Sequence, residues 1–144
     1  MTDWNQLKTI VDSIAKHSLN PHVSSLNAIY QLQRTLQVTA SYHKHKIELA
    51  KRGITVEQHI RDTYFSRHQS VVVCKNSYPY HLKPSIEHWL VWCNPNVLTE
   101  AEFLKSIPTL MKSYFQNCKT LWFQNPPEWR SVKSVPHVHV FVLK

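Results

Sequence analysis

The segment PHVHVFVLK, residues 136–144, decides the fold. Valines at every second position alternate with His137, His139 and Phe141, and this period of two predicts a β-strand. The valine side predicts a core face, so the histidine side must look into a pocket or out to water. Imidazole titrates near neutral pH, which makes His137 and His139 candidates for catalysis, phosphate contact or metal binding. A half-exposed strand that merely carries histidine is the alternative.

The segments before this strand divide into a helical part, residues 1–68, and a sheet part, residues 69–144. Apolar residues at helical spacing predict a helix over residues 3–17. A second helix is expected to start at Asn20 and Pro21 and to run until Gly53 stops it. A capping box from Thr55 to Gln58 opens a short helix that ends near Tyr64.

The second part predicts strands at SVVVCKN, IEHWLVWCN and TLWFQN (70–76, 86–94 and 120–125) before the final one. Between them, residues 98–115 predict a helix with a Thr99–Glu102 capping box. The expected fold is α+β: N-terminal helices, then a small antiparallel sheet of about four strands with one inserted helix. At 144 residues, this is most simply a single domain.

Composition excludes some function classes and favours others. The chain has one glycine, so the glycine-rich phosphate loops of Walker and dinucleotide-binding proteins are excluded. A net charge of +8 favours anionic partners, such as nucleotides, other phosphorylated molecules or nucleic acid. A lysine-rich surface without such a partner is the alternative.

Three cysteines, without metal-type spacing or a signal peptide, indicate reduced thiols inside the cell, in the cytoplasm or nucleus. No membrane span is expected, because no segment approaches about 20 apolar residues.

The loop before the last strand gathers groups that can contact phosphate: Asn125, Arg130, Ser131, Lys133 and Ser134. Trp129 in the same loop could stack on a base or a sugar, or fold back over the core.

His88 could face His137 and His139 if its strand pairs with the last one, and three histidines could then bind Zn²⁺ or Fe²⁺. A hydrogen-bonded histidine at a strand end is the alternative, and no metal or cofactor is assigned. The basic segment SYHKHKIELAKR, residues 41–52, predicts a solvated helix face, with phosphate or nucleic-acid contact as the alternative.

The ending FQNPPEWRSVKSVPHVHVFVL, residues 123–143, distantly resembles the motif of histidine-triad (HIT-like) nucleotide hydrolases and transferases. This resemblance implies that His139 is the nucleophile, that His137 orients the site, and that Lys133 and Asn125 contact phosphate or ribose. The third histidine of the motif is replaced by Phe141, which implies that phosphate binds without being cleaved.

A closer resemblance spans most of the chain. The segments YPYHLKPSIEHWLVW and NPPEWRSVKSVPHVHVFV look like the fungal N-acetylglucosamine-induced proteins, a domain family that also occurs in some large viruses. The resemblance implies no assigned activity, and it implies that Phe141 is a feature of that family.

The sequence therefore predicts a histidine-lined, cationic pocket that binds a nucleotide-like phosphorylated ligand, with hydrolysis or transfer left open. Its candidate catalytic residues are His139 and His137. The candidate ligand contacts are Lys133, Asn125, Arg130, Ser134, His88 and Trp129. A module that binds protein or nucleic acid, a histidine metal site and homo-oligomer formation stay open as alternatives.

Overall fold

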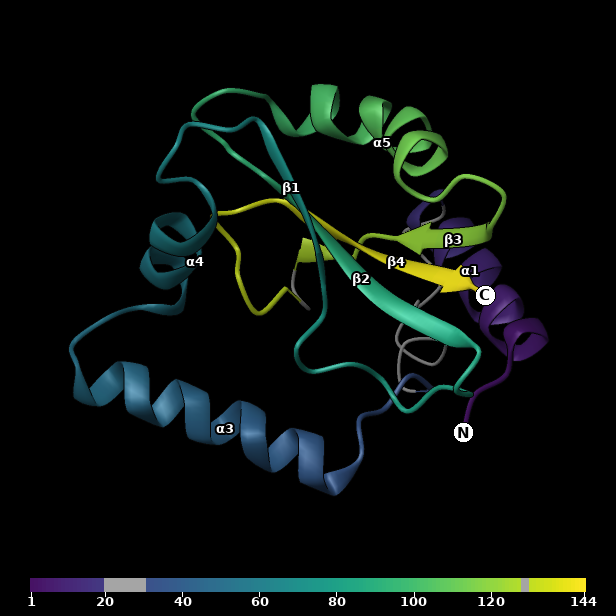
Figure 1. Cartoon of the computed structure of the whole chain (residues 1–144), viewed down its shortest axis with the longest axis horizontal. Helices are drawn as coiled ribbons and strands as arrows, with labels where there is room; N and C mark the ends of the chain where they lie inside the picture. Colours follow the sequence, from purple (N-terminus) through teal and green to yellow (C-terminus); the bar gives the residue numbers. More distant parts are fainter. Residues whose placement is uncertain (20–30, 128–129) are drawn as a thin grey trace.

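The computed structural model describes residues 1–19, 31–127 and 130–144, and it has the expected α+β arrangement (Figure 1). Its helices are α1 (Trp4–Leu19), α3 (Leu36–Lys51), α4 (Val56–Tyr64) and α5 (Glu100–Tyr114). Its strands are β1 (Val71–Lys75), β2 (Ile86–Cys93), β3 (Lys119–Phe123) and β4 (His137–Leu143). The strands form one antiparallel sheet in the order β1-β2-β4-β3.

Strand β4 is an inner strand of this sheet, paired with β2 on one side and with β3 on the other. The register sets His139 opposite Leu90 of β2 and Phe123 of β3. Both faces of β4 are buried, because helices cover the sheet on each side.

The valine face of β4 packs against α5. Val138 and Val140 are fully buried with Phe103 and Ile107 of that helix, which confirms the predicted core face. The predicted capping box is present: Thr99 accepts from the Glu102 backbone N–H, and the Glu102 side chain accepts from that of Thr99.

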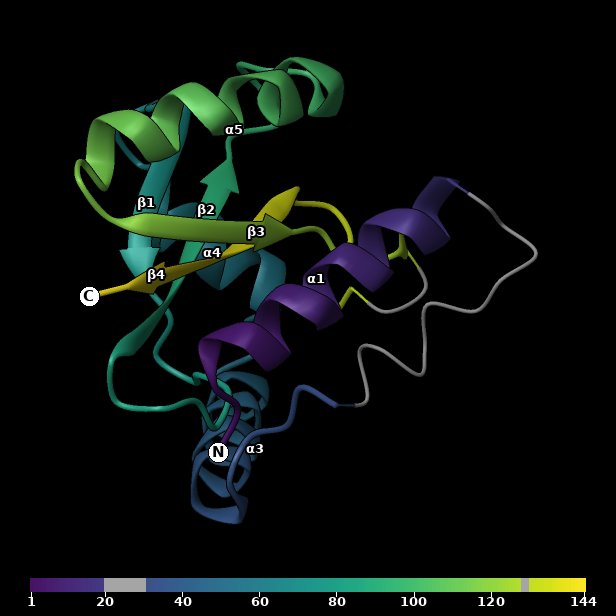
Figure 2. The same cartoon turned by 90° about the vertical axis from the view of Figure 1, so that its right-hand side faces the viewer.

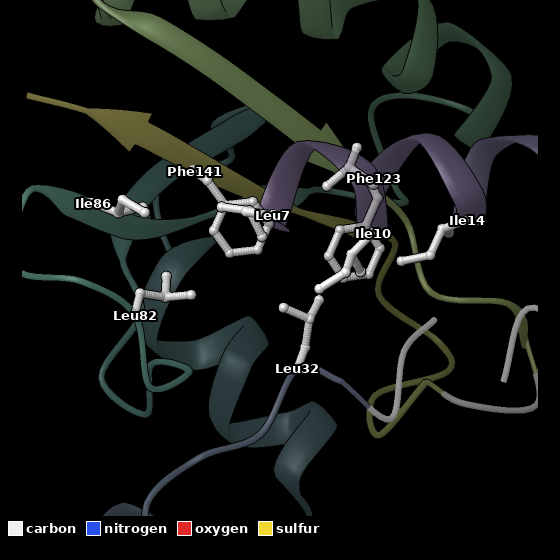
Figure 3. Packing of buried hydrophobic residues seen from close by; sticks show 9 residues of the cluster. Leu7, Ile10, Ile14, Leu32, Leu82, Ile86, Phe123 and Phe141 are labelled. Atoms are coloured by element: carbon white, nitrogen blue, oxygen red, sulfur yellow. The ribbon is translucent and has the colours of Figure 1, made fainter. Parts of the chain in front are cut away.

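Helix α1 covers part of the opposite face, as Figure 2 shows, with the sheet between α1 and α5. Its apolar stripe, which includes Leu7, Ile10 and Ile14, packs on Phe123 and Phe141 (Figure 3). Phe141 is completely buried there, so its ring is part of the core.

Helix α4 covers the other end of that face. Ile60 and Phe65 pack with Trp92 of β2 and with Val132 and Val135 of the loop before β4. Helix α3 lies beyond α4, away from the sheet (Figure 1), and touches Tyr78 of the β1–β2 loop through Tyr42 and His45.

The expected second helix starts later than the sequence suggests. The described residues 31–34 are not helical, and Thr35 is the N-cap, with its side chain accepting from the Val38 N–H. The proposed start at Asn20 and Pro21 lies outside the described residues. The helix ends as expected, because Gly53 adopts a left-handed φ of +68° directly after the cap residue Arg52.

Within the described part of the chain, no helix has the length and apolar character needed to cross a membrane.

Candidate functional site

A cavity of about 450 Å³ lies on the histidine face of the sheet. Its floor is formed by Leu90 and Trp92 of β2 with His137 and His139 of β4. Helices α3 and α4, the β1–β2 loop and the loop before β4 form its walls. The sheet therefore presents both candidate histidines to the same cavity.

On the floor, His139 contacts His88 of the neighbouring strand. His88 Nε2 lies 2.8 Å from His139 Nδ1, and the two rings are 5.1 Å apart. Tyr80 stacks on both rings, at 4.7 Å from His88 and 5.6 Å from His139. Of the expected contacts of His88 with the histidine pair, the structure shows the one with His139.

Burial keeps these imidazoles neutral. It lowers the pKa of His88 to about 3, with a further lowering from the Arg34 charge. Burial also lowers the pKa of His139 well below 6.5, and His88, His137 and Arg34 act in the same direction. For His137, burial lowers the pKa and outweighs the hydrogen bond to Val135, which raises it.

His137 has different neighbours from His139. Its Nδ1 lies 3.1 Å from the carbonyl oxygen of Val135, and its ring lies 4.5 Å from that of Trp92. Trp92 Nε1 is buried and meets no acceptor in hydrogen-bond geometry, although the Cys74 thiol lies beside it.

The loop before β4 reaches the floor through Asn125. The Asn125 amide Nδ2 lies 3.4 Å from His139 Nε2, while its buried Oδ1 has no partner among the described residues. Asn125 and Trp92 both line the cavity, and each has one buried polar atom for which the described residues offer no partner in hydrogen-bond geometry. Such atoms are uncommon in native proteins and are expected where water or a ligand binds.

Arg130 holds this loop rather than lining the cavity. Its Nε donates to the Asn125 carbonyl at 2.9 Å, and its Nη1 pairs with Glu100 at 3.0 Å. The Glu100 carboxylate also accepts from Gln124 at 2.7 Å. The predicted phosphate donor Arg130 is therefore already engaged with a carboxylate.

Positive charge enters the cavity mainly from the helical part of the chain, since the third lining cation, Lys75 of β1, pairs with Glu87. The Arg34 guanidinium lies 5.3 Å from the ring centres of both Tyr42 and Tyr80, and its Nε donates to the Tyr78 carbonyl at 2.6 Å. Lys46 Nζ lies 4.7 Å from the ring centre of Tyr42. Among the lining residues in the described ranges there is no Asp or Glu.

Of the other predicted ligand contacts, Lys133 and Ser134 are exposed and do not line the cavity. The Ser134 carbonyl accepts from Arg61 Nη2 at 3.5 Å. His88 lies behind His139, outside the lining. Trp129 lies outside the described residues.

Arg34, Lys46 and the tyrosines on the cavity wall were not among the predicted site residues. One signal was present: Tyr42, His45, Lys46 and Leu49 follow the spacing of one helix face. That face of α3 turns toward the cavity, while His43 and Lys44 are exposed. The basic segment is thus solvated on only part of its surface. Arg34 carries no such periodic signal.

The metal alternative finds no support in the side-chain geometry. No cluster of three or more His, Cys, Asp or Glu side chains within residues 1–19, 31–127 and 130–144 is arranged to hold a metal ion.

Comparison with solved structures identifies a similar fold. A protein whose structure is titled "Crystal Structure of HTC1" superposes with a TM-score of 0.66 and 21% identity, over 100% of this chain and 86% of that chain. At this identity, the similarity concerns the fold alone.

Sequence comparison extends over nearly the whole chain. The uncharacterised protein YPL067C of Saccharomyces cerevisiae is 24% identical over 169 residues, covering 96% of this chain and 77% of the yeast protein. Residues 3–143 match the family described as "Protein of unknown function (DUF3605)". The chain therefore belongs to the DUF3605 family.

Proposed function

We propose that the cavity binds a phosphorylated, nucleotide-like small molecule, with its anionic group at Arg34 and Lys46. The observation that carries this proposal is a cavity lined by Arg34, Lys46 and Lys75 and, among its described lining residues, by no carboxylate. Lys75 already pairs with Glu87, so Arg34 and Lys46 are the cations left for a ligand. Cations without a paired carboxylate attract anions, and phosphate is the common anionic group of small metabolites.

The remaining surface of the cavity suits an aromatic or sugar-like body. Tyr42, Tyr78, Tyr80 and Trp92 line it with rings, on which a planar base can stack. The volume of about 450 Å³ falls within the range of about 300–1,000 Å³ that is typical of small-molecule sites.

The test is calorimetric titration of the protein with AMP, adenosine and pyrophosphate. AMP and pyrophosphate should bind, and Lys46→Gln should weaken both by about tenfold, as expected for one charge-assisted hydrogen bond. Lys44→Gln makes the same change in net charge on an exposed face of α3 and serves as the control.

Arg34→Lys is a second arm of the same test. Lysine keeps the charge but cannot both donate to the Tyr78 carbonyl and contact the rings of Tyr42 and Tyr80, so weaker AMP binding is expected. Equal affinities of Lys46→Gln and Lys44→Gln, or no binding of any phosphorylated probe, would overturn the proposal.

Hydrolysis or transfer through a histidine nucleophile is a second candidate function, favoured by two neutral imidazoles on the cavity floor. An imidazole nitrogen would bond to phosphorus as the bond to the leaving oxygen breaks, and water would later release the phosphorus group. Incubation with dinucleoside polyphosphates and nucleoside phosphoramidates tests this candidate. Absent turnover, or turnover unchanged in His139→Ala, contradicts a nucleophilic His139.

A ligand of this kind fits a protein of the cytoplasm or nucleus, where nucleotides are abundant. The three cysteines are free in the structure, in keeping with a reducing compartment.

A further inference from the structure

The two histidines on the cavity floor make different hydrogen bonds through the same ring nitrogen. His137 Nδ1 lies 3.1 Å from the Val135 carbonyl oxygen. A carbonyl oxygen only accepts, so Nδ1 must carry the proton. Because the lowered pKa of His137 keeps its ring neutral, its Nε2 holds an unshared electron pair.

The proton positions on His139 follow from Tyr80. The Tyr80 backbone N–H donates to His88 Nδ1 at 3.2 Å, and the Asn76 amide nitrogen lies 3.5 Å from Nδ1 and 3.3 Å from Nε2. A backbone N–H can only donate, so Nδ1 is the acceptor and neutral His88 carries its proton on Nε2. This proton is donated to His139 Nδ1 at 2.8 Å. His139, which is also neutral, therefore carries its own proton on Nε2 and is a donor there.

Asn125 can accept a hydrogen bond from this N–H group. Its amide lies 3.4 Å from His139 Nε2 with the nitrogen turned toward the ring, where two donors would face each other. Rotating the amide by 180° puts Oδ1 opposite the N–H, which gives this buried oxygen the partner that it lacks. The Nε2–H of His139 is then used within the protein.

The ring of His137 lies against that of Trp92, with the ring centres 4.5 Å apart, and both side chains line the cavity. Both are at least 94% buried, and the buried Trp92 Nε1 lies beside the Cys74 thiol. The lone pair on His137 Nε2 is therefore the hydrogen-bonding group that this part of the floor offers. A hydroxyl group matches it, because a hydroxyl can donate to an imidazole nitrogen.

We propose that His137, through Nε2, accepts a hydrogen bond from a hydroxyl group of the ligand, whereas His139 is a positioning residue held as a proton donor by Tyr80 and His88. This inference rests on the proposed function for its ligand, which is then a hydroxylated organic phosphate. Its sugar-like part lies on the floor beside His137 and Trp92, and its phosphate lies at Arg34 and Lys46. Strand β4 therefore contacts the hydroxyl-bearing part of the ligand and not its phosphate.

The proton positions can be tested without a ligand. Long-range ¹H–¹⁵N correlation spectra of ¹⁵N-histidine-labelled protein at pH 7.5 distinguish the two neutral forms of each ring. We expect His137 to carry its proton on Nδ1, and His88 and His139 to carry theirs on Nε2. A proton on Nε2 of His137, or on Nδ1 of His139, overturns the inference.

The ligand contact is tested with two substitutions that each preserve one nitrogen. In His137→Asn the amide nitrogen replaces Nδ1 and still donates to the Val135 carbonyl, but the acceptor nitrogen Nε2 is lost. In His137→Gln the amide oxygen replaces Nε2 and keeps the acceptor. Unfolding midpoints that match the wild type establish that both variants are folded.

AMP and pyrophosphate serve as probes, because only AMP carries sugar hydroxyls. His137→Asn should lower the affinity for AMP by about tenfold, which corresponds to the loss of one hydrogen bond. The affinity for pyrophosphate should not change. His137→Gln should retain most of the AMP affinity. Equal losses for both probes, or no loss in His137→Asn, overturn the inference. Failure of wild-type protein to bind either probe overturns the proposed function instead, and the spectra still decide the proton positions.

Discussion

His88 Nε2 of strand β2 lies 2.8 Å from His139 Nδ1 of strand β4, and both rings are at least 95% buried. The contact exists because β2 and β4 are neighbours, with His88 opposite Phe141 and Leu90 opposite His139. It gives the two histidines of the HVHV segment different surroundings, one tied to a second imidazole and the other to a backbone carbonyl.

The buried imidazoles should make stability depend on pH. Folding lowers the pKa of His88 from 6.5 to about 3, and it lowers the pKa values of His137 and His139 as well. Below pH 6.5 the unfolded chain therefore binds more protons than the folded one. The free energy of unfolding should be greatest above pH 6.5 and fall as the pH decreases toward 3, by up to about 1.4 kcal/mol per pH unit for each ring.

Urea unfolding at several pH values between 7.5 and 4.5 measures this slope. His88→Phe should make the slope shallower, whatever it does to stability at pH 7.5. The exposed His43 is the control position, since His43→Gln should leave the slope unchanged. A stability that is flat across this range would contradict neutral burial of the three rings.

Arg130 should stabilise the loop that carries Asn125. Lysine at this position keeps the charge but cannot make both contacts, one to the Asn125 carbonyl and one to Glu100. Arg130→Lys should therefore lower the free energy of unfolding by about 1–2 kcal/mol, measured in urea. Arg67→Lys makes the same chemical change at an exposed position and should have no effect. Equal stabilities of the two variants would show that these contacts contribute nothing.

Restoring a third histidine should not restore a histidine triad. Phe141 is completely buried beneath α1, so Phe141→His places a polar ring in an apolar core. We expect a loss of roughly 2–4 kcal/mol in the free energy of unfolding and no gain of nucleotide hydrolysis. Phe141→Leu, the apolar control, should lose about 1 kcal/mol. Nucleotide hydrolysis by a folded Phe141→His variant would contradict the conclusion that residue 141 belongs to the core.

Local patterns in the sequence were sufficient to predict most of the helices and strands. Alternation in the last strand indicated its two faces, and the capping signals at Thr55 and Thr99 located two helix starts, because both kinds of signal depend on residues within a few positions of one another. The full capping box forms at Thr99, whereas Thr55 makes the N-cap bond and the Gln58 side chain donates to Asp62 instead. The start of α3 differs from the prediction, which let one helix run without a break up to Gly53, whereas residues 31–34 are not helical.

The candidate site also combines features that the sequence predicts with features that only the tertiary structure shows. The sequence by itself determined that His137 and His139 share a strand face, because neighbouring side chains in a strand point in opposite directions. The tertiary structure alone decided that His88 pairs with His139, and that Arg34 and Lys46 bring the positive charge to the cavity in place of Lys133. The His88–His139 contact joins residues 51 positions apart, and the hydrogen bond that holds Arg34 at Tyr78 joins residues 44 positions apart. Both depend on strand order and packing, which no local pattern records.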